Sequence, residues 1–147
     1  MTEQGATTEL LGIGPAAARA GVSERALRYY QQLGLLRPSG QTPGGMRRYS
    51  DQDLERVARI RDLQTLLGLN LDEIAVVLRN DDRIAEIRAA YYDKRTGAAK
   101  RRELARECLV LLEDLRGTVE GKRTALDTFL EDLEARIARV LEVLKAP

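Results

Sequence analysis

Arginine is the residue of this sequence whose type and placement are best suited to chemistry, and that chemistry is the binding of anions. Eight arginines and four carboxylates lie in the segment 22–61, although the whole chain has a net charge of only +1. The guanidinium group is planar, stays charged and can hydrogen-bond two oxygens of a phosphate, or the edge of a guanine, at once. The local excess of positive charge therefore indicates a surface for nucleic acid.

Residues suited to catalysis or to metal binding are few. The chain has no histidine and one cysteine, Cys108, so a chelating metal site within one chain is not expected. We expect Cys108 to pack as a small apolar residue, and a thiol-sensing role is the alternative. The pattern Gly12-x-Gly14 lacks the strand and the spacing of a nucleotide-binding loop. We therefore expect no catalytic residues, no metal and no cofactor, and hence no enzyme.

The composition favours a helical protein of the cytoplasm. Hydrophobic residues make up 44%, charged residues 32% and aromatic residues only 4% of the chain, a balance typical of helical proteins. A single cysteine fits a reducing compartment, and nothing in the sequence resembles a secretory leader. No apolar stretch approaches the roughly 18 residues that a membrane span needs, so no membrane partner is expected.

Two short helices are predicted around the first arginines. The first begins near Ile13, has Pro15 in its first turn and ends at Gly21, in keeping with the usual places of proline and glycine. Ser23 is a typical N-cap for the second helix, which is expected to end just before Gly34. Two short helices joined by about three residues form a helix-turn-helix.

A β-hairpin is predicted directly after the second helix. Leu35–Pro38 is interpreted as a short strand, the glycine- and proline-rich segment 39–45 as a turn, and Met46–Tyr49 as the strand that pairs back. A hairpin in this position is a wing, so the predicted arrangement is a winged helix-turn-helix.

Several helices are predicted after the wing. A third helix begins with a capping box at Ser50 and ends at Gly68, and a short helix begins at Asn70. A separate amphipathic helix is expected over about 81–93, and a break over 94–97.

The C-terminal segment 97–147 is predicted to be one long helix. Its apolar stripe recurs every three or four residues, a pattern typical of a coiled coil, and such a helix needs a second copy to cover it. Gly117 and Gly121 each cost about 1 kcal/mol relative to alanine. A kink or a helical hairpin at these glycines is therefore the alternative to a continuous helix. The stripe contains Leu104, Cys108, Leu111, Leu115, Thr118, Lys122, Leu126, Phe129, Leu133, Ile137, Val140 and Leu144.

One set of motifs occurs in a consistent order over about residues 11–79. It comprises Ile13-Gly14, Gly21-Val22-Ser23, Leu27-Arg28-Tyr29-Tyr30, Gly34-Leu35-Leu36-Arg37-Pro38, Gly45-Met46-Arg47-Arg48-Tyr49-Ser50, Leu54 and Leu67-Gly68-Leu69-Asn70-Leu71-Asp72-Glu73-Ile74. In these motifs the sequence resembles the MerR family of bacterial transcription regulators. The C-terminal part resembles the family only in kind, as a dimerising coiled coil of variable sequence.

The resemblance implies a mainly α fold. The expected organisation is a flexible N-terminus over 1–10, a winged helix-turn-helix over 11–80, a connecting helix over 81–96 and a dimerisation helix over 97–147. Family members are homodimers joined by an antiparallel coiled coil. They bind pseudo-palindromic operators in promoters with long spacers, and they bend and undertwist the DNA.

The resemblance also implies partners and a location. The expected partners are double-stranded promoter DNA, a second copy of the chain, RNA polymerase at the promoter and an unidentified small-molecule effector. The expected location is the nucleoid in a bacterial cytoplasm. The sequence leaves open the operator, the target genes and whether transcription is activated or repressed.

DNA contacts are implied by the resemblance in the recognition helix, Ser23–Tyr30, and in the wing. Arg25 and Arg28 can reach base edges or phosphates. Tyr29 and Tyr30 match a pair whose hydroxyls bind phosphates, with packing of one of them in the core as the alternative. The implied DNA-binding residues are Ser23, Arg25, Arg28, Tyr29, Tyr30, Arg47, Arg48 and Tyr49.

The wing residues differ in how closely they follow the family. Arg47 and Tyr49 match the family's wing arginine and wing tyrosine. Arg48 alternates to the other face of the strand, and Met46 stands where the family usually has an aromatic residue.

Two alternatives to this interpretation concern the C-terminal half. Tyr91 and Tyr92 either line a small pocket or pack a junction between helices. A scaffold protein that uses the coiled coil and keeps a non-specific or vestigial DNA-binding head is the rival function, and Arg28 and Arg47 argue against it.

Overall fold

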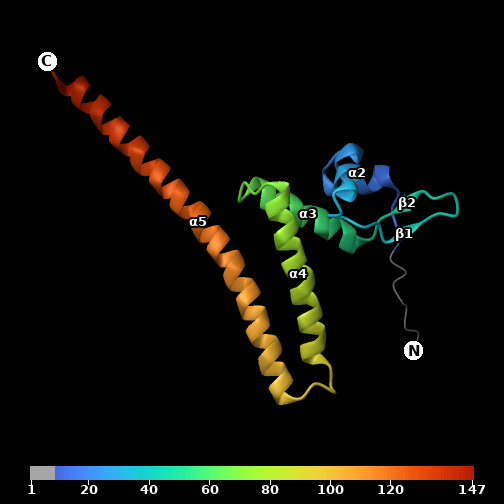
Figure 1. Ribbon diagram of the computed structural model, residues 1–147. Coiled ribbons are helices and arrows are strands. Elements are labelled where there is room, and N and C mark those ends of the chain that lie inside the picture. Colours follow the sequence, from blue (N-terminus) through green and yellow to red (C-terminus); the bar gives the residue numbers. More distant parts are fainter. Residues whose placement is uncertain (1–8) are drawn as a thin grey trace, which may run out of the picture. The chain divides into compact units, whose positions relative to one another are not determined.

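The computed structural model describes residues 9–147, so the expected flexible N-terminus falls almost entirely outside the described residues (Figure 1). The chain forms two compact units that meet between Leu78 and Arg79. The described part is mainly helical, as expected, and its elements are α1 (Ile13–Ala20), α2 (Glu24–Gln32), β1 (Gly40–Gln41), β2 (Arg47–Arg48), α3 (Asp51–Thr65), α4 (Leu71–Tyr92) and α5 (Ala98–Lys145).

Local signals set the bounds of α1 and α2, as predicted. Gly21 ends α1 with a φ of 65°, and its N–H bonds the carbonyl groups of Ala17 and Ala18. Glycine adopts this left-handed conformation without steric cost. The side chain of Ser23 then accepts a hydrogen bond of 3.0 Å from the backbone N–H of Ala26 and caps α2.

The prediction for the first wing strand was wrong. Leu35 and Leu36 are buried, and their N–H groups bond the carbonyl of Tyr30 at 2.9 and 3.3 Å. These two residues therefore close the end of α2 and fill the core. The strand is β1 instead, and it pairs antiparallel with β2, with Gly40 opposite Arg48.

The core of the first unit lies among α1, α2, α3, the start of α4 and the segments between them. Its largest fully buried side chains are Tyr49, Leu27, Leu36, Ile60, Ile74 and Val57. The capping box predicted at the start of α3 is present, since the Ser50 and Asp53 side chains bond each other's backbone N–H groups.

The short helix at Asn70 and the separate helix over 81–93 are in fact one continuous helix, α4. The cap at its start is as predicted, because Asn70 and Glu73 exchange side chain to backbone hydrogen bonds of 2.9 Å. The segment between the two predicted helices is polar but contains neither glycine nor proline. Asparagine and aspartate there cost the helix only about 0.7 kcal/mol each, which is too little to end it.

In the second unit, the C-terminal part of α4 and the N-terminal part of α5 form a helical hairpin. Arg83 on α4 pairs with Glu107 on α5 at 2.5 Å, while Ile87 and Leu104 are buried between the helices. The predicted break is present, and α5 begins after Gly97.

The long helix α5 runs unbroken through Gly117 and Gly121, so the predicted continuous helix is present and the helical hairpin is excluded. Its 48 residues make it about 70 Å long. None of the described helices is both long and apolar enough to cross a membrane.

Candidate nucleic-acid interface

The exposed face of α2 carries most of the residues predicted to bind DNA. Ser23, Arg25, Arg28 and Tyr29 are all exposed, whereas Leu27 and Tyr30 on the opposite face are buried. Positions three and four apart lie side by side on a helix, so Arg25, Arg28 and Tyr29 form one surface.

The arginines on this face are available for a ligand. Arg25 has no ion pair or hydrogen bond with any described residue. Arg28 pairs with Glu24 at 3.3 Å, but more than half of its side chain is exposed. Such surface pairs along a helix contribute only about 0.3–0.5 kcal/mol, so a phosphate or a base can replace Glu24 at little cost.

The wing places its two arginines in different surroundings. Arg47 is exposed, whereas Arg48 is half-buried. A Cβ added to Gly12 would lie 3.2 Å from Nη1 of Arg48, so this guanidinium lies against the start of α1. The alternation predicted along the strand is therefore present, and Arg47 is the arginine of the pair that faces outward.

The tip of the wing is a tight turn held by Thr42. The Thr42 N–H bonds the Met46 carbonyl at 2.8 Å, and its side-chain oxygen accepts from the Met46 N–H at 3.1 Å. Gly45 lies in this turn with a φ of 82°, a conformation that a residue with a Cβ adopts only with strain. The turn therefore fixes the position of Arg47, the first residue of β2.

The exposed face of α2 and the wing meet at one hollow. This hollow has a volume of about 330 Å³ and is lined by Ile13, Arg28, Gly45, Met46 and Arg47. Arg28 and Arg47 are far apart in the sequence, and the fold brings them to the same surface. This juxtaposition is the central geometric feature of the candidate interface.

Asp53 holds the base of the wing. Its Oδ2 accepts hydrogen bonds from the N–H of Ser39 at 3.0 Å, the Oγ of Ser39 at 2.6 Å and the N–H of Ser50 at 2.8 Å. Ser39 precedes β1 and Ser50 follows β2, so one buried carboxylate joins both ends of the hairpin. The sequence predicted the cap at Ser50, but gave no sign of the link to Ser39.

Tyr49 is fully buried beneath the wing rather than exposed with the other wing residues. Its hydroxyl accepts a hydrogen bond from the side chain of Gln31, at the end of α2. Its backbone forms two hydrogen bonds of 2.8 Å with Leu11. Tyr49 therefore positions the wing against α2, and its predicted contact with DNA has no support from its position.

Of the two adjacent tyrosines, Tyr30 packs in the core and Tyr29 is exposed. Tyr30 is only 7% exposed, and its hydroxyl donates to Gln64 at 3.3 Å. Burial raises the pKa of Tyr30, and the positive charge of Arg61 opposes this change. The structure therefore agrees with the alternative that one of the two tyrosines packs in the core.

Two arginines of the basic segment hold the fold together. Arg56 Nε donates to the carbonyl of Leu35 at 2.5 Å, and Arg61 Nη1 donates to the carbonyl of Ala20 at 3.2 Å. The Ala20 carbonyl is at the C-terminal end of α1, where backbone acceptors lack partners within the helix, and the Leu35 carbonyl lies in the segment after α2. Counting charge along the sequence could not separate these arginines from those of the interface.

Comparison with known proteins gives matches over the first unit and over most of the chain. Residues 12–81 match the MerR HTH family regulatory protein. An uncharacterized HTH-type transcriptional regulator of Pseudomonas aeruginosa is 32% identical over 123 residues, which are 84% of this chain and 82% of that protein. The mercuric resistance operon regulatory protein of Shigella flexneri is 46% identical over 74 residues, 50% of this chain; the chain spans only about half of that relative's length, 51%.

Solved structures match over both units. HiNmlR, a MerR family regulator lacking the sensor domain, was crystallised bound to promoter DNA; it matches with 25% identity and a TM-score of 0.55, over 91% of this chain and 92% of that chain. A MerR family transcriptional regulator from Bacillus cereus matches with 26% identity and a TM-score of 0.54, over 91% and 76% of the two chains. The chain belongs to the MerR family, which is a family of transcription regulators and not of enzymes.

Proposed function

We propose that this protein binds promoter DNA as a homodimer, with α2 in the major groove and the wing on the neighbouring phosphate backbone. The observation that carries the proposal is the hollow that Arg28 and Arg47 line together. A helix fits the width of the major groove. A second basic element beside it would then reach the backbone strand that borders the groove.

The proposed roles of the side chains follow from their exposure. Arg25 and Arg28 read base edges or bind the phosphates that flank them, since both lie on the exposed face of α2. Arg47 binds a phosphate from the wing. Ser23 and Tyr29 add hydrogen bonds to the backbone, and Arg48 stays near the start of α1.

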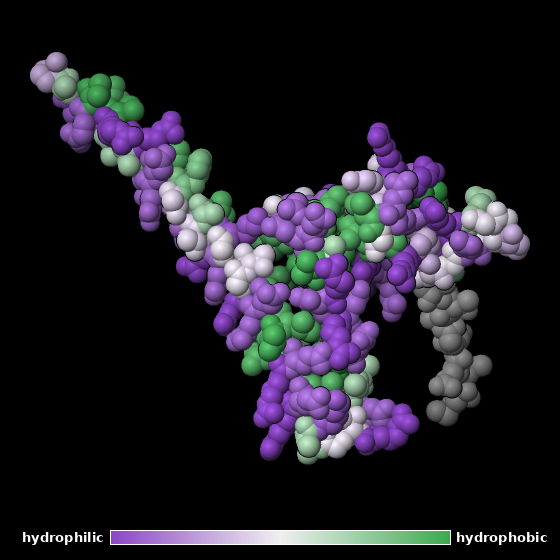
Figure 2. Space-filling view, in the orientation of Figure 1, coloured by the Kyte–Doolittle hydropathy of each residue, from purple (hydrophilic) through white to green (hydrophobic). Residues whose placement is uncertain are grey.

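The proposed dimer rests on the exposed apolar stripe of α5. Apolar side chains there alternate with charged ones along the helix (Figure 2). Burying one such side chain stabilises an assembly by about 1.5–3 kcal/mol, and an antiparallel coiled coil with a second α5 would bury many together. The exposed apolar residues of this part include Leu126, Phe129, Leu130, Ile137, Val140, Leu141 and Leu144.

A two-fold dimer sets the form of the proposed operator. Two identical heads read two half-sites of opposite direction, so the operator is pseudo-palindromic. If both heads bind one face of the duplex, the DNA between the half-sites must bend and untwist, and this deformation costs free energy. We propose that this deformation changes how RNA polymerase engages the promoter.

The test is fluorescence anisotropy with a labelled duplex from the region upstream of the gene. Arg28→Ala should weaken specific binding at least about tenfold, because one arginine–guanine contact is worth about 1–3 kcal/mol. Arg106→Ala is the matched control, since Arg106 is an exposed arginine of α5 with no ion pair to a described residue. Unchanged binding by Arg28→Ala, at equal dimer content, would contradict the proposed role of α2.

The scaffold alternative makes the opposite prediction. If the head were vestigial, Arg28→Ala would not alter the preference for the upstream duplex over a random duplex. The absence of an ion pair between Arg25 or Arg47 and any described residue favours the DNA-binding function. A functional DNA surface keeps such charges free for phosphates.

A further inference from the structure

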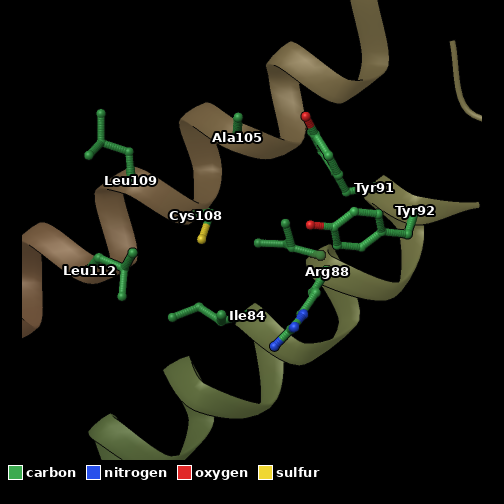
Figure 3. A pocket seen from close by; sticks show the side chains of 9 residues that line it. Ile84, Arg88, Tyr91, Tyr92, Ala105, Cys108, Leu109 and Leu112 are labelled. Atoms are coloured by element: carbon green, nitrogen blue, oxygen red, sulfur yellow. The ribbon is translucent and has the colours of Figure 1, made fainter. Parts of the chain in front are cut away.

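An open cavity lies between α4 and α5 within the second unit (Figure 3). Its volume is about 440 Å³, within the roughly 300–1,000 Å³ typical of small-molecule sites. The Cys108 thiol and the Tyr92 hydroxyl point into the space between the two helices. The proposed DNA-binding function uses none of the residues that line this cavity.

The walls of the cavity are mostly apolar and are only partly covered by the hairpin itself. Ile87 is buried, but Tyr91, Leu109 and Leu112 are 38%, 55% and 49% exposed. Exposed apolar surface favours association with an apolar group, because its transfer out of water is favourable. A ligand with a hydrocarbon or aromatic body fits these walls.

The polar groups at the cavity can receive a negatively charged group. Arg88 lines the cavity without an ion pair or hydrogen bond to any described residue, and no carboxylate lines it. The hydroxyls of Tyr91 and Tyr92 likewise have no hydrogen-bond partner in the described part of the chain. Three other arginines of the hairpin are, by contrast, already engaged: Arg83 with Glu107, Arg95 with Asp93, and Arg101 with the carbonyl of Tyr91.

The aromatic wall is held in place before any ligand binds. The Arg101 guanidinium lies 5.8 Å from the centre of the Tyr91 ring, and its Nε donates to the Tyr91 carbonyl at 3.0 Å. The rings of Tyr91 and Tyr92 pack edge to face, with 5.2 Å between their centres. A prearranged wall lowers the entropic cost of binding.

We propose that this cavity binds a small amphipathic carboxylate. Arg88 pairs with the carboxylate, and the apolar body of the ligand covers Ile87, Cys108 and Leu112. Charge complementarity selects this class, because the described residues that line the cavity include the unpaired cation of Arg88 and no carboxylate. The proposal concerns ligand binding, and its measurement needs no DNA, so its failure is distinguishable from failure of the proposed DNA binding. It requires that the proposed coiled coil, whose stripe includes Cys108, leaves this cavity open.

The single cysteine gives a reporter for this cavity. Cys108 is the chain's only thiol and lines the cavity, so its alkylation by the neutral reagent iodoacetamide reports on access to the cavity. Octanoate and octanol are the probes, because they share an apolar chain and differ in charge at neutral pH. Octanoate should protect Cys108 at a concentration at least about tenfold lower than octanol does, as expected for a charge-assisted contact of about 1.4 kcal/mol or more.

Variants of Arg88 test whether this residue causes the preference for octanoate over octanol. Arg88→Ala should raise the protecting concentration of octanoate at least about tenfold and leave that of octanol unchanged, whereas Arg88→Lys should keep part of the preference. Arg106→Ala is the control for loss of an exposed arginine. Circular dichroism checks that each variant is folded.

Three results would overturn the proposal. Equal protection by octanoate and octanol would show that charge plays no part. Unchanged protection by octanoate in Arg88→Ala would remove the assigned residue. A thiol that reacts only after denaturation would show that the cavity is covered, as it would be by a second copy of the chain.

Discussion

The two units of this protein differ in how their polar groups are used. In the first unit, polar side chains join segments that are distant in sequence, as Asp53 joins both ends of the wing. In the second unit, most ion pairs lie on the surface, and many link residues three or four apart on α5. The first unit thus has the contacts of a self-contained fold, whereas α5 leaves much of its apolar surface exposed, and we propose that it depends on a partner to cover that surface.

The largest expected effect breaks this dependence. Ile137→Asp places a charge in the apolar stripe of α5 and enters a symmetric dimer twice. We expect the dimer Kd to rise on the order of a hundredfold, because burying an unpaired charge is costly. Ala135→Asp, on the opposite face, should have little effect. Sedimentation velocity measures both, and equal dimer content in the two variants would contradict the proposed coiled coil.

A second prediction concerns the self-contained character of the first unit. Asp53→Ala leaves the N–H groups of Ser39 and Ser50 without their acceptor. We expect a loss of about 2–3 kcal/mol in the free energy of unfolding of this unit. Asp62→Ala, also on α3 but exposed, should cost less than about 0.5 kcal/mol. Urea unfolding and hydrogen exchange of the wing amides measure the difference, and similar losses in both variants would argue against the role of Asp53.

A third prediction isolates the conformation of the wing from its charge. At Gly45 an added Cβ meets no atom within 4 Å, but φ is 82°, so Gly45→Ala acts through backbone strain of about 1 kcal/mol. We expect roughly a fivefold loss of DNA affinity if binding needs this turn. Gly44→Ala is the control, since φ is not positive there. Equal affinity of both variants would mean that the wing turn does not position Arg47 for DNA.

The smallest expected effect concerns the hairpin of the second unit. A hydrogen bond from Arg83 lowers the pKa of Glu107, so this pair stabilises the fold above the ordinary pKa of glutamate. The contribution is lost as pH falls through the lowered pKa. Glu107→Gln should therefore lower the Tm near neutral pH, and this difference in Tm should shrink as the pH falls through the lowered pKa. Glu134→Gln, at an exposed site, should leave the Tm unchanged over the same pH range.

The elements that the sequence predicted best are those with local causes. Ser23, Ser50 and Asn70 each act on a backbone group three residues away, and all three caps are present. The start of the wing was misplaced, because burial of Leu35 and Leu36 depends on a core assembled from distant segments. Local patterns carry no information about such contacts.

The candidate interface was predictable in its elements but not in the role of each side chain. Which face of α2 packs on the core decides that Tyr29 is exposed and Tyr30 is buried. Two adjacent tyrosines do not reveal in the sequence which of them lies on that face. The link between Ser39 and Asp53 spans more than one element of structure. It could not be read from spacing alone.

The pairing of Leu11 with Tyr49 has a practical consequence. Leu10 itself lies beside the hairpin, because a Cβ added to Gly40 would come within 2.9 Å of the Leu10 side chain. A purification tag joined directly to Leu10 would crowd the surface that we propose binds phosphate, and the charge of the tag would alter the measured DNA affinity. The same proximity makes this position a good place for a fluorophore that reports on the hairpin when duplex is added.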